Sequence, residues 1–258
     1  MTLIIDSGYT WDTDALNYVN AVKAADAAAG QTGGLESGVE DAIDAFVKGC
    51  KADGIWHAIK ASCILAGART LQGALVPLVG TAPTNINFVS GNYNRKTGLV
   101  GDGTTKSLNT NRAGSADGQN NIHVAVYAST LDSLSGRYLS GSTVSPTIAI
   151  IGNTTGFRTR VQSSTLYTVG SGTAVPSIIA VSRSSSANFN WRFGSQSGSQ
   201  SDTSVGISPT NYCVFSGNGP DNYTTARLSF YSIGESLDLA LLDARVTALM
   251  SAFAAAIP

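Results

Sequence analysis

The residue composition of the chain changes sharply near position 81. Residues 1–80 are rich in Ala and carry apolar side chains at helical spacing, whereas Ser, Thr, Gly and Asn dominate residues 81–235. Short runs in this middle part alternate apolar and polar residues, as in 122–127, and alternation with a period of two is typical of β-strands. The helical spacing returns over residues 236–258.

These three parts predict a mainly β protein: an antiparallel jelly-roll β-sandwich over 81–235, between an N-terminal helical segment and a C-terminal helix. Arg192 and Arg227 alternate with apolar neighbours and should point outward. The run 147–151 is almost wholly apolar, which predicts a central strand covered on both faces. Further strands are expected at 85–89, 157–161, 177–182, 188–193, 212–215 and 227–233.

The N-terminal segment is expected to be helical after a short strand at residues 3–5. Asp12 or Thr13 could cap a first helix that runs to about residue 29. Apolar residues at steps of three and four predict a second helix over 35–50. A third helix is predicted by the spacing of Trp56, Ile59, Cys63 and Leu65.

The C-terminal helix carries an apolar seam. Its members recur at steps of 3, 4, 3 and 4, the spacing of a coiled-coil a/d seam, and they are Leu239, Leu242, Val246, Leu249 and Phe253. The seam could dock against this chain's own sheet or N-terminal helices. Alternatively it could join copies of the chain, in which case we expect a homo-oligomer, with a trimer favoured.

Composition excludes several classes of partner. Charged residues make up 13% of the chain, against roughly 25% in an average protein. The net charge is −1 without a basic cluster, so we expect no nucleic-acid binding. Absence of a long apolar run predicts no membrane insertion, and the N-terminus does not resemble a signal peptide. Three scattered cysteines, Cys50, Cys63 and Cys213, suggest buried small residues rather than disulfides.

Reactive side chains are sparse, and we expect neither catalysis nor a required cofactor. The sequence has three glutamates, and no predicted strand carries the paired acids that glycoside hydrolysis needs. His57 and His123 lack metal-ligand spacing. The Gly-rich stretch 98–107 lacks a Lys directly after its second Gly, as a phosphate loop requires. Calcium is the one ion considered, and its best local cluster of loop oxygens is Asp117, Asn120 and Asn121.

Sugar binding needs an aromatic platform with amide and hydroxyl groups around it. The candidate ligand-binding residues are Tyr138, Trp191, Tyr212 and Tyr223, which lie near stretches rich in Asn, Ser and Gln. Trp191 and Tyr212 could instead pack in the core, whereas Tyr138 and Tyr223 are expected to be more exposed.

Four stretches together resemble a known group of proteins. They are GCKADGIW at 49–56, AIKASCILAGARTL at 58–71, NYNRKTGLVGDGTTK at 92–106 and SFYSIGESLDL at 229–239. The group consists of bacteriophage and prophage virion proteins whose β-region is similar to concanavalin A-like lectin/glucanase sandwiches. The resemblance covers roughly residues 12–255 and carries over no catalytic residues. The acidic cluster of the glucanases has no counterpart here.

The resemblance implies a component of the virion, made in the host cytoplasm, of tail-fibre or tail-tip type. We therefore expect a non-enzymatic structural protein that binds a host-surface glycan and other virion proteins. Two alternatives stay open: a purely architectural capsid-decoration or tail-assembly protein, and a polysaccharide-degrading enzyme.

Overall fold

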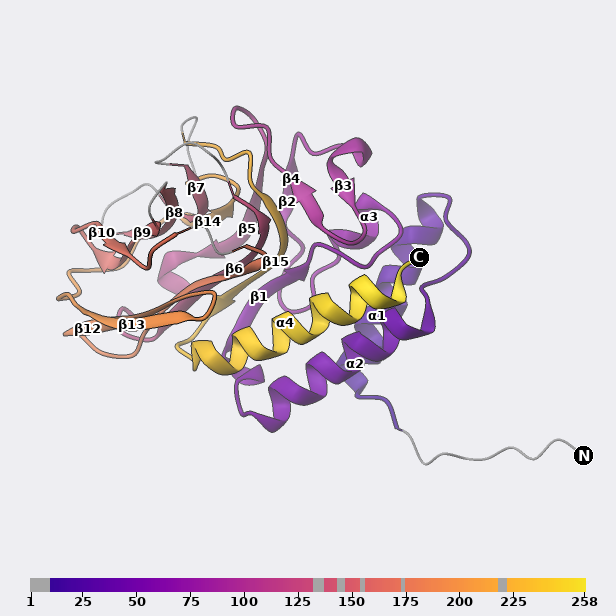
Figure 1. Ribbon diagram of the computed structural model, residues 1–258, viewed down its shortest axis with the longest axis horizontal. Coiled ribbons are helices and arrows are strands. Elements are labelled where there is room, and N and C mark those ends of the chain that lie inside the picture. The colour runs from indigo at the N-terminus through magenta and orange to yellow at the C-terminus, as the bar shows by residue number, and fades with distance from the viewer. Residues whose placement is uncertain (1–9, 132–136, 143–146, 154–155, 173–174, 218–221) are drawn as a thin grey trace, which may run out of the picture.

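Two antiparallel sheets are stacked as a jelly-roll sandwich in the computed structural model, with helices contributed by both ends of the chain (Figure 1). The structure describes residues 10–131, 137–142, 147–153, 156–172, 175–217 and 222–258. The mainly β fold expected from the sequence is confirmed. The strand expected at residues 3–5 lies outside the described residues.

The first sheet, sheet A, has the strand order β13-β12-β11-β6-β15-β4-β3, and β1 also pairs with β15. All its pairings are antiparallel. In chain order the strands are β1 (Ile59–Ile64), β3 (Tyr93–Asn94), β4 (Gly98–Val100), β6 (Ile122–Thr130), β11 (Ser177–Arg183), β12 (Asn188–Phe193), β13 (Gln196–Ser201) and β15 (Arg227–Gly234).

The second sheet, sheet B, has the order β10-β9-β8-β7-β14-β5-β2 and is also antiparallel. Its strands are β2 (Thr84–Ile86), β5 (Ser107–Ala113), β7 (Tyr138–Gly141), β8 (Thr147–Asn153), β9 (Gly156–Ser163), β10 (Tyr167–Val169) and β14 (Asn211–Val214). Short 3-10 turns are η1 (Trp56–Ala58), η2 (Ser90–Asn92) and η3 (Gly114–Ala116).

The core between the sheets follows the period of two within the strands. In β6, Val124 and Val126 face sheet B, whereas Ala125 and Tyr127 belong to a second apolar cluster on the other face of sheet A. Side chains alternate across a strand, so a strand with both faces covered must be apolar at successive positions. This explains why residues 122–128 are all buried.

Helices form a third layer over the outer face of sheet A (Figure 1). They are α1 (Thr13–Ala28), α2 (Ser37–Ala52) and α4 (Leu239–Ala256), with a single turn, α3 (Leu71–Ala74), near α1. The Phe46 ring of α2 meets the Phe230 ring of β15 edge to face, with centroids 5.8 Å apart. This layer buries the apolar stripe of each long helix against the sheet.

The seam of α4 is covered within the chain. Its residues Leu239, Leu242, Val246, Leu249 and Phe253 are 0–7% exposed and pack with α2 and sheet A. Gly38 and Gly49 of α2 permit the close approach, since a Cβ on either would lie under 3 Å from Ala256 or Arg245 of α4. Of the two interpretations of the seam, the structure shows docking on the chain itself. The same side chains are therefore not available to join copies of the chain.

By length and composition alone α4 could also span a membrane, although the sequence pattern suggested that no segment would. In the structure it is held to the body of the protein by charge as well as by apolar contacts. Asp243 pairs with Arg192 of β12 at 2.6 Å, and Arg245 pairs with Asp53 after α2 at 2.7 Å. Both ends of these ion pairs belong to the same folded unit.

The third predicted helix is wrong. Residues 56–58 form η1, and the apolar run that follows is strand β1, which pairs antiparallel with β15. Five of its six residues are buried. Lys60 and Ser62 alternate with apolar residues in this run. Ile59 and Cys63 also lie four positions apart, so the same short run fits helical spacing, and spacing alone does not separate a strand from a helix. Segment 1–80 thus contributes a strand to the sandwich.

Two smaller expectations concern single residues. Cys50, Cys63 and Cys213 are buried free thiols, as expected, and burial raises the pKa of Cys50 and Cys63 to about 12. Arg192 points away from the intersheet core, but α4 lies over that face, so its guanidinium is paired rather than free in solvent. Arg227 donates to the Gly98 carbonyl at 2.7 Å.

Candidate functional site

The four aromatic residues proposed to bind ligand do not form one site. Tyr212 is 0% exposed, in the core between the sheets. Tyr138 is 6% exposed and packs with Ala149 and Ile151 in a small cluster of its own, so the expectation that it is exposed is wrong. Tyr138 and Tyr212 lie in the neighbouring strands β7 and β14 but belong to different clusters.

Trp191 and Tyr223 are half-buried, so they keep some access to solvent. Trp191, in β12, packs partly on the core between the sheets and meets Phe157 of β9 edge to face at 6.2 Å. Tyr223 lies just before β15, in a different part of the fold. Trp191 therefore stays a candidate platform by itself, at the edge hairpin β12–β13.

The three residues of the calcium candidate direct their oxygens to different partners. Both oxygens of Asp117 accept from Arg112, at 2.9 and 2.5 Å. Asn120 Oδ1 accepts from Ser204 Oγ, while Asn121 Oδ1 accepts from Ser236 N and Oγ. Nor do three or more His, Cys, Asp or Glu side chains within the described ranges form a group that could hold a metal ion. The proposed set does not converge on one ion.

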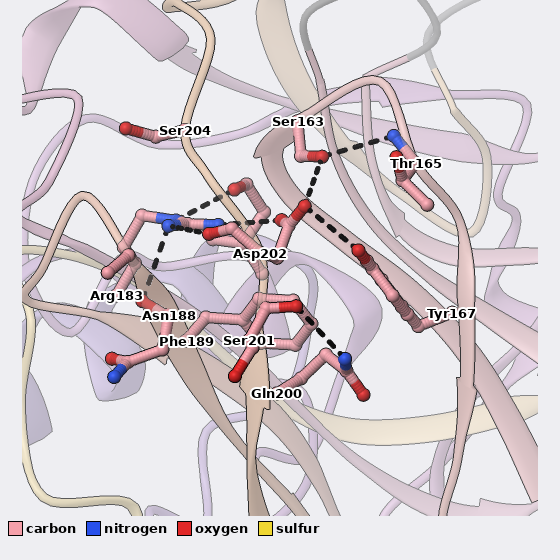
Figure 2. Close-up of polar contacts among 12 residues, drawn as sticks. Ser163, Thr165, Tyr167, Arg183, Asn188, Phe189, Gln200, Ser201, Asp202 and Ser204 are labelled. Carbon is pink, nitrogen blue, oxygen red and sulfur yellow. Dashed lines mark hydrogen bonds and ion pairs between the residues drawn. The ribbon is translucent and has the colours of Figure 1, made fainter.

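The most buried ion pair among the described residues lies between the two sheets (Figure 2). Arg183 of β11 is 0% exposed and donates to Asp202 Oδ2 at 2.8 Å and to the Val161 carbonyl of β9 at 2.9 Å. The other oxygen of Asp202 accepts from Ser163 of β9 at 2.8 Å and Tyr167 of β10 at 3.2 Å. We call these four side chains the intersheet clasp.

The intersheet clasp is suited to structure rather than chemistry. Nη1 of Arg183 also faces several backbone carbonyls, including that of Asp202 at 2.9 Å. Burial is the main cause that raises the pKa of the Tyr167 hydroxyl and lowers that of Arg183. An acid with both oxygens bonded and 8% exposed has no open side for a substrate.

A larger and more open feature lies where the helical layer meets residues 90–95. We call it the Arg69–Arg95 groove, a cavity of about 510 Å³ within the usual range for small-ligand sites. Its lining mixes polar and apolar surface and comes from the residues after α1, from α3 and the residues before it, and from η2 and β3 with the residue that follows: Ala29, Gln31, Arg69, Thr70, Leu71, Gln72, Ser90, Tyr93 and Arg95.

Glu36, immediately before α2, fixes both arginines of the groove. Arg95 binds its carboxylate with two nitrogens, at 3.0 and 2.5 Å, and Arg69 Nη2 binds it at 3.1 Å. Arg69 Nε also donates to the Gly34 carbonyl. The hydrogen bond from Arg95 holds the pKa of Glu36 below its ordinary value. Two cations thus share one anion, and a forked pair of this kind is geometrically specific.

Asp26 of α1 holds two of the residues that line the groove in place. It is 1% exposed and accepts from the backbone N–H of Arg69 and Thr70, both at 2.8 Å, and from the Thr70 hydroxyl at 2.6 Å. Gly73 is required here, because a Cβ at that position would overlap the Asp26 carboxylate. Tyr93 donates its hydroxyl to the Ala68 carbonyl at 2.7 Å, and burial raises its pKa.

This arrangement leaves a fixed set of polar groups facing the groove. Gln31, Gln72 and Ser90 are exposed, and none of their side chains has a hydrogen-bond partner among the described residues. Arg69 Nη1 likewise has no hydrogen-bond partner among the described residues. Amides, a hydroxyl and a guanidinium can together donate to and accept from a polyhydroxylated ligand. The groove can bind such a ligand, but Glu36 is held ionised by two arginines and is a poor proton donor.

Sequence reasoning missed this groove. Its residues come from positions 26–36, 69–73 and 90–95, which no spacing connects. Five of them do lie in the stretches 58–71 and 92–106 that carry the family resemblance: Arg69, Thr70, Leu71, Tyr93 and Arg95. Nothing in those stretches distinguishes a ligand contact from a packing contact.

Comparisons with known proteins show the fold and no more. No family model and no curated protein matches the chain. A mutant of Trypanosoma rangeli sialidase displaying trans-sialidase activity is similar over 81% of this chain and 39% of its own, with 8% identity and a TM-score of 0.52. The binding domain of botulinum neurotoxin serotype D is similar over 74% of this chain and 51% of its own, with 9% identity and a TM-score of 0.50.

At such identities the likeness concerns only the arrangement of the strands. This chain spans about two fifths and about half of the lengths of these two structures.

Proposed function

We propose that the protein is a non-enzymatic carbohydrate-binding component of a bacteriophage virion, of tail-fibre or tail-tip type, and that the Arg69–Arg95 groove is its glycan site. The observation that carries the proposal is the groove itself: open amide, hydroxyl and guanidinium groups on a support fixed by Glu36 and Asp26. Arg69 and Arg95 are already ordered by Glu36 and lose little entropy when a ligand binds. The virion assignment rests on the sequence resemblance.

Binding rather than hydrolysis is favoured by the acids of the groove. Glu36 is held by two arginines and has a lowered pKa, and Asp26 is buried under three hydrogen bonds. A general acid needs a pKa near the working pH and reach to the leaving group. Neither residue meets both requirements. Weak individual contacts would gain strength from many copies on one particle.

Self-association is a further part of the proposal, again with a trimer favoured. It must use a surface other than the α4 seam, since that seam is covered within the chain. Light scattering on the purified protein at micromolar concentration tests it, and a monomer would contradict it.

The direct test is a glycan array followed by variants of the groove. We expect binding to host-surface saccharides, and the double variant Gln31→Ala, Gln72→Ala should weaken it about 10-fold or more because two hydrogen-bonding amides are lost. Both glutamines are exposed, so thermal unfolding should stay unchanged. The matched control is Gln200→Ala on the edge strand β13. It removes an amide that does not line the groove and should keep full binding.

Other results would redirect or end the proposal. Loss of binding in Trp191→Leu with full binding in the groove variant would place the site at the β12–β13 hairpin. No glycan binding, together with stable incorporation into particles, would support the architectural alternative. Steady release of oligosaccharides from capsule or lipopolysaccharide would show an enzyme.

A further inference from the structure

A second cavity, separate from the Arg69–Arg95 groove, lies between the C-terminal half of α4 and sheet A. Its volume is about 410 Å³, again in the range of small-molecule sites. Tyr127 of β6, Pro176, and Met250 and Ala254 of α4 give it largely apolar walls. Lys96, in the turn between β3 and β4, and Ser229 of β15 also line it. We call it the Ser229 cavity.

A β-bulge accounts for the position of Ser229. Leu228 pairs with Ala128 and Phe230 pairs with Tyr127, so Ser229 is an extra residue in β15 with no partner of its own in β6. Leu228 belongs to the core between the sheets, whereas Phe230 belongs to the helix-side cluster. The bulge changes the alternation at this point, and bulges often serve to re-aim a side chain. Here it places Ser229 at the cavity.

The Ser229 hydroxyl is buried without a partner. The residue is 1% exposed, and its Oγ has no hydrogen-bond partner in the described structure. Its neighbour Ser129, at the same cavity, donates to the Thr97 carbonyl at 2.7 Å. An unpaired buried hydroxyl is costly to a fold. The cavity next to it gives room for a ligand oxygen to accept a hydrogen bond from this hydroxyl.

Lys96 supplies the charge of the cavity. It is exposed, and its ammonium forms no ion pair with any residue that the structure describes. The cavity therefore combines apolar walls, one unpaired hydroxyl donor and one free cation. Apolar walls with a few fixed polar groups are what an amphipathic ligand requires.

We propose that the Ser229 cavity binds a medium-chain aliphatic carboxylate. The chain lies against Tyr127, Pro176 and Met250, while the carboxylate accepts from the Ser229 hydroxyl and pairs with Lys96. This site is independent of the Arg69–Arg95 groove and of the glycan proposal. It involves no covalent step.

Isothermal titration of the full chain with sodium octanoate tests the proposal, with 1-octanol as a ligand that lacks the charge. We expect saturable binding of octanoate, and weaker binding of octanol. Ser229→Ala and Lys96→Gln should each lower the affinity for octanoate about 5- to 10-fold, the effect of one hydrogen bond or ion pair to a charged group. Ser197→Ala on β13 is the matched control and should bind like the unchanged protein.

Two further readouts keep the test decisive. Ser229→Ala should unfold at the same or a higher temperature, because it removes an unpaired buried hydroxyl. Ala254→Leu adds bulk at the cavity from an exposed position of α4 and should abolish binding without unfolding the protein. Absence of saturable octanoate binding, or equal affinity in Ser229→Ala, Lys96→Gln and the control, would overturn the proposal.

Discussion

The two sheets of the sandwich are built from similar Ser-, Thr- and Gly-rich sequence but live in different surroundings. Sheet A is packed on both faces, by sheet B on one side and by α2 and α4 on the other (Figure 1). Sheet B packs one face on the core, and its other face carries only the small cluster of Tyr138, Ala149 and Ile151 with Leu166 among the described residues. One sheet is an inner layer and the other an outer layer.

The burial of polar residues along the strands differs in the same way. All seven residues of β11 in sheet A are buried, including Ser177, Ser182 and Arg183. In β9 of sheet B, Arg158 and Arg160 stay partly exposed between buried neighbours. An inner layer needs its polar groups paired, and an outer layer can leave them to water. We infer from this difference that sheet A contributes most of the stability of the sandwich. Ligand contacts are then expected where the helical layer ends.

The largest expected effect is on the helix-covered face of sheet A. Phe230→Ala removes a ring that is 0% exposed and packed on Phe46, and should lower the free energy of unfolding by about 3–5 kcal/mol. Ile151→Ala, on the outer face of sheet B, should lower it by about 2 kcal/mol because a small cluster can collapse around the gap. Guanidinium unfolding measures both. An equal or larger loss in Ile151→Ala would break the comparison.

The intersheet clasp should come next. Asp202→Asn keeps the shape of the side chain but leaves the buried guanidinium of Arg183 without its counter-charge, which should lower stability by about 3 kcal/mol. Asp243→Asn is the control on the helix side, because its pair with Arg192 is partly exposed and should be worth less than about 1 kcal/mol. Similar losses in the two variants would show that the clasp adds nothing by being buried.

The pH dependence tests His123 in sheet A, which is 0% exposed. Its Nδ1 contacts the Glu235 carbonyl at 2.6 Å and must donate, so in the neutral ring Nε2 accepts from Ser232 Oγ at 2.7 Å. Burial lowers the pKa of His123 to about 4, against about 6.5 in the unfolded chain. The unfolded state therefore binds the proton more readily between these values.

The free energy of unfolding should have its full value above about pH 6.5 and should decrease as the pH falls from about 6.5 toward about 4. The loss should be about 2 kcal/mol at pH 5 relative to pH 8. Denaturant unfolding at a series of pH values measures this. His123→Gln should flatten the curve between pH 5 and 7, whereas His57→Gln should keep its slope. A curve that stays steep in His123→Gln would show that another group takes up the proton on unfolding.

The smallest expected effect is on the outer face of α4. Leu241→Ser changes a residue that is 36% exposed and should alter stability by less than about 0.5 kcal/mol. Leu242→Ser, one residue along, places a hydroxyl where the side chain is 0% exposed and should be far more damaging. Thermal unfolding compares the pair. A change of oligomeric state in Leu241→Ser would locate a self-association surface on this helix.

Much of the outer layer and of the long helices could be predicted from sequence, because their patterns are local. The alternation in 157–161 of β9 and the steps of three and four in α2 each depend on one polar side and one apolar side. The inner layer is harder. Strand β1 also fits helical spacing, which predicts a helix, and its pairing with β15 joins residues about 170 positions apart.

The candidate site was less predictable still. Aromatic residues were chosen for their chemistry, yet Tyr138 and Tyr212 are core residues, since an aromatic side chain carries no local sign of whether its strand faces inward. The groove depends on Glu36, Arg69 and Arg95, which meet only because α2, the loop before α3 and β3 converge. Convergence of distant segments is a property of the fold, not of any one of them.

The most direct test of the account is an NMR titration of the isotopically labelled protein with the host saccharide that binds best on the array. The account predicts that shifts concentrate on the side-chain amides of Gln31 and Gln72 and on Nε of Arg69, and that the saccharide stays intact. Shifts confined to the Trp191 indole and the β12–β13 hairpin, or new reducing ends in the saccharide spectrum, would contradict it.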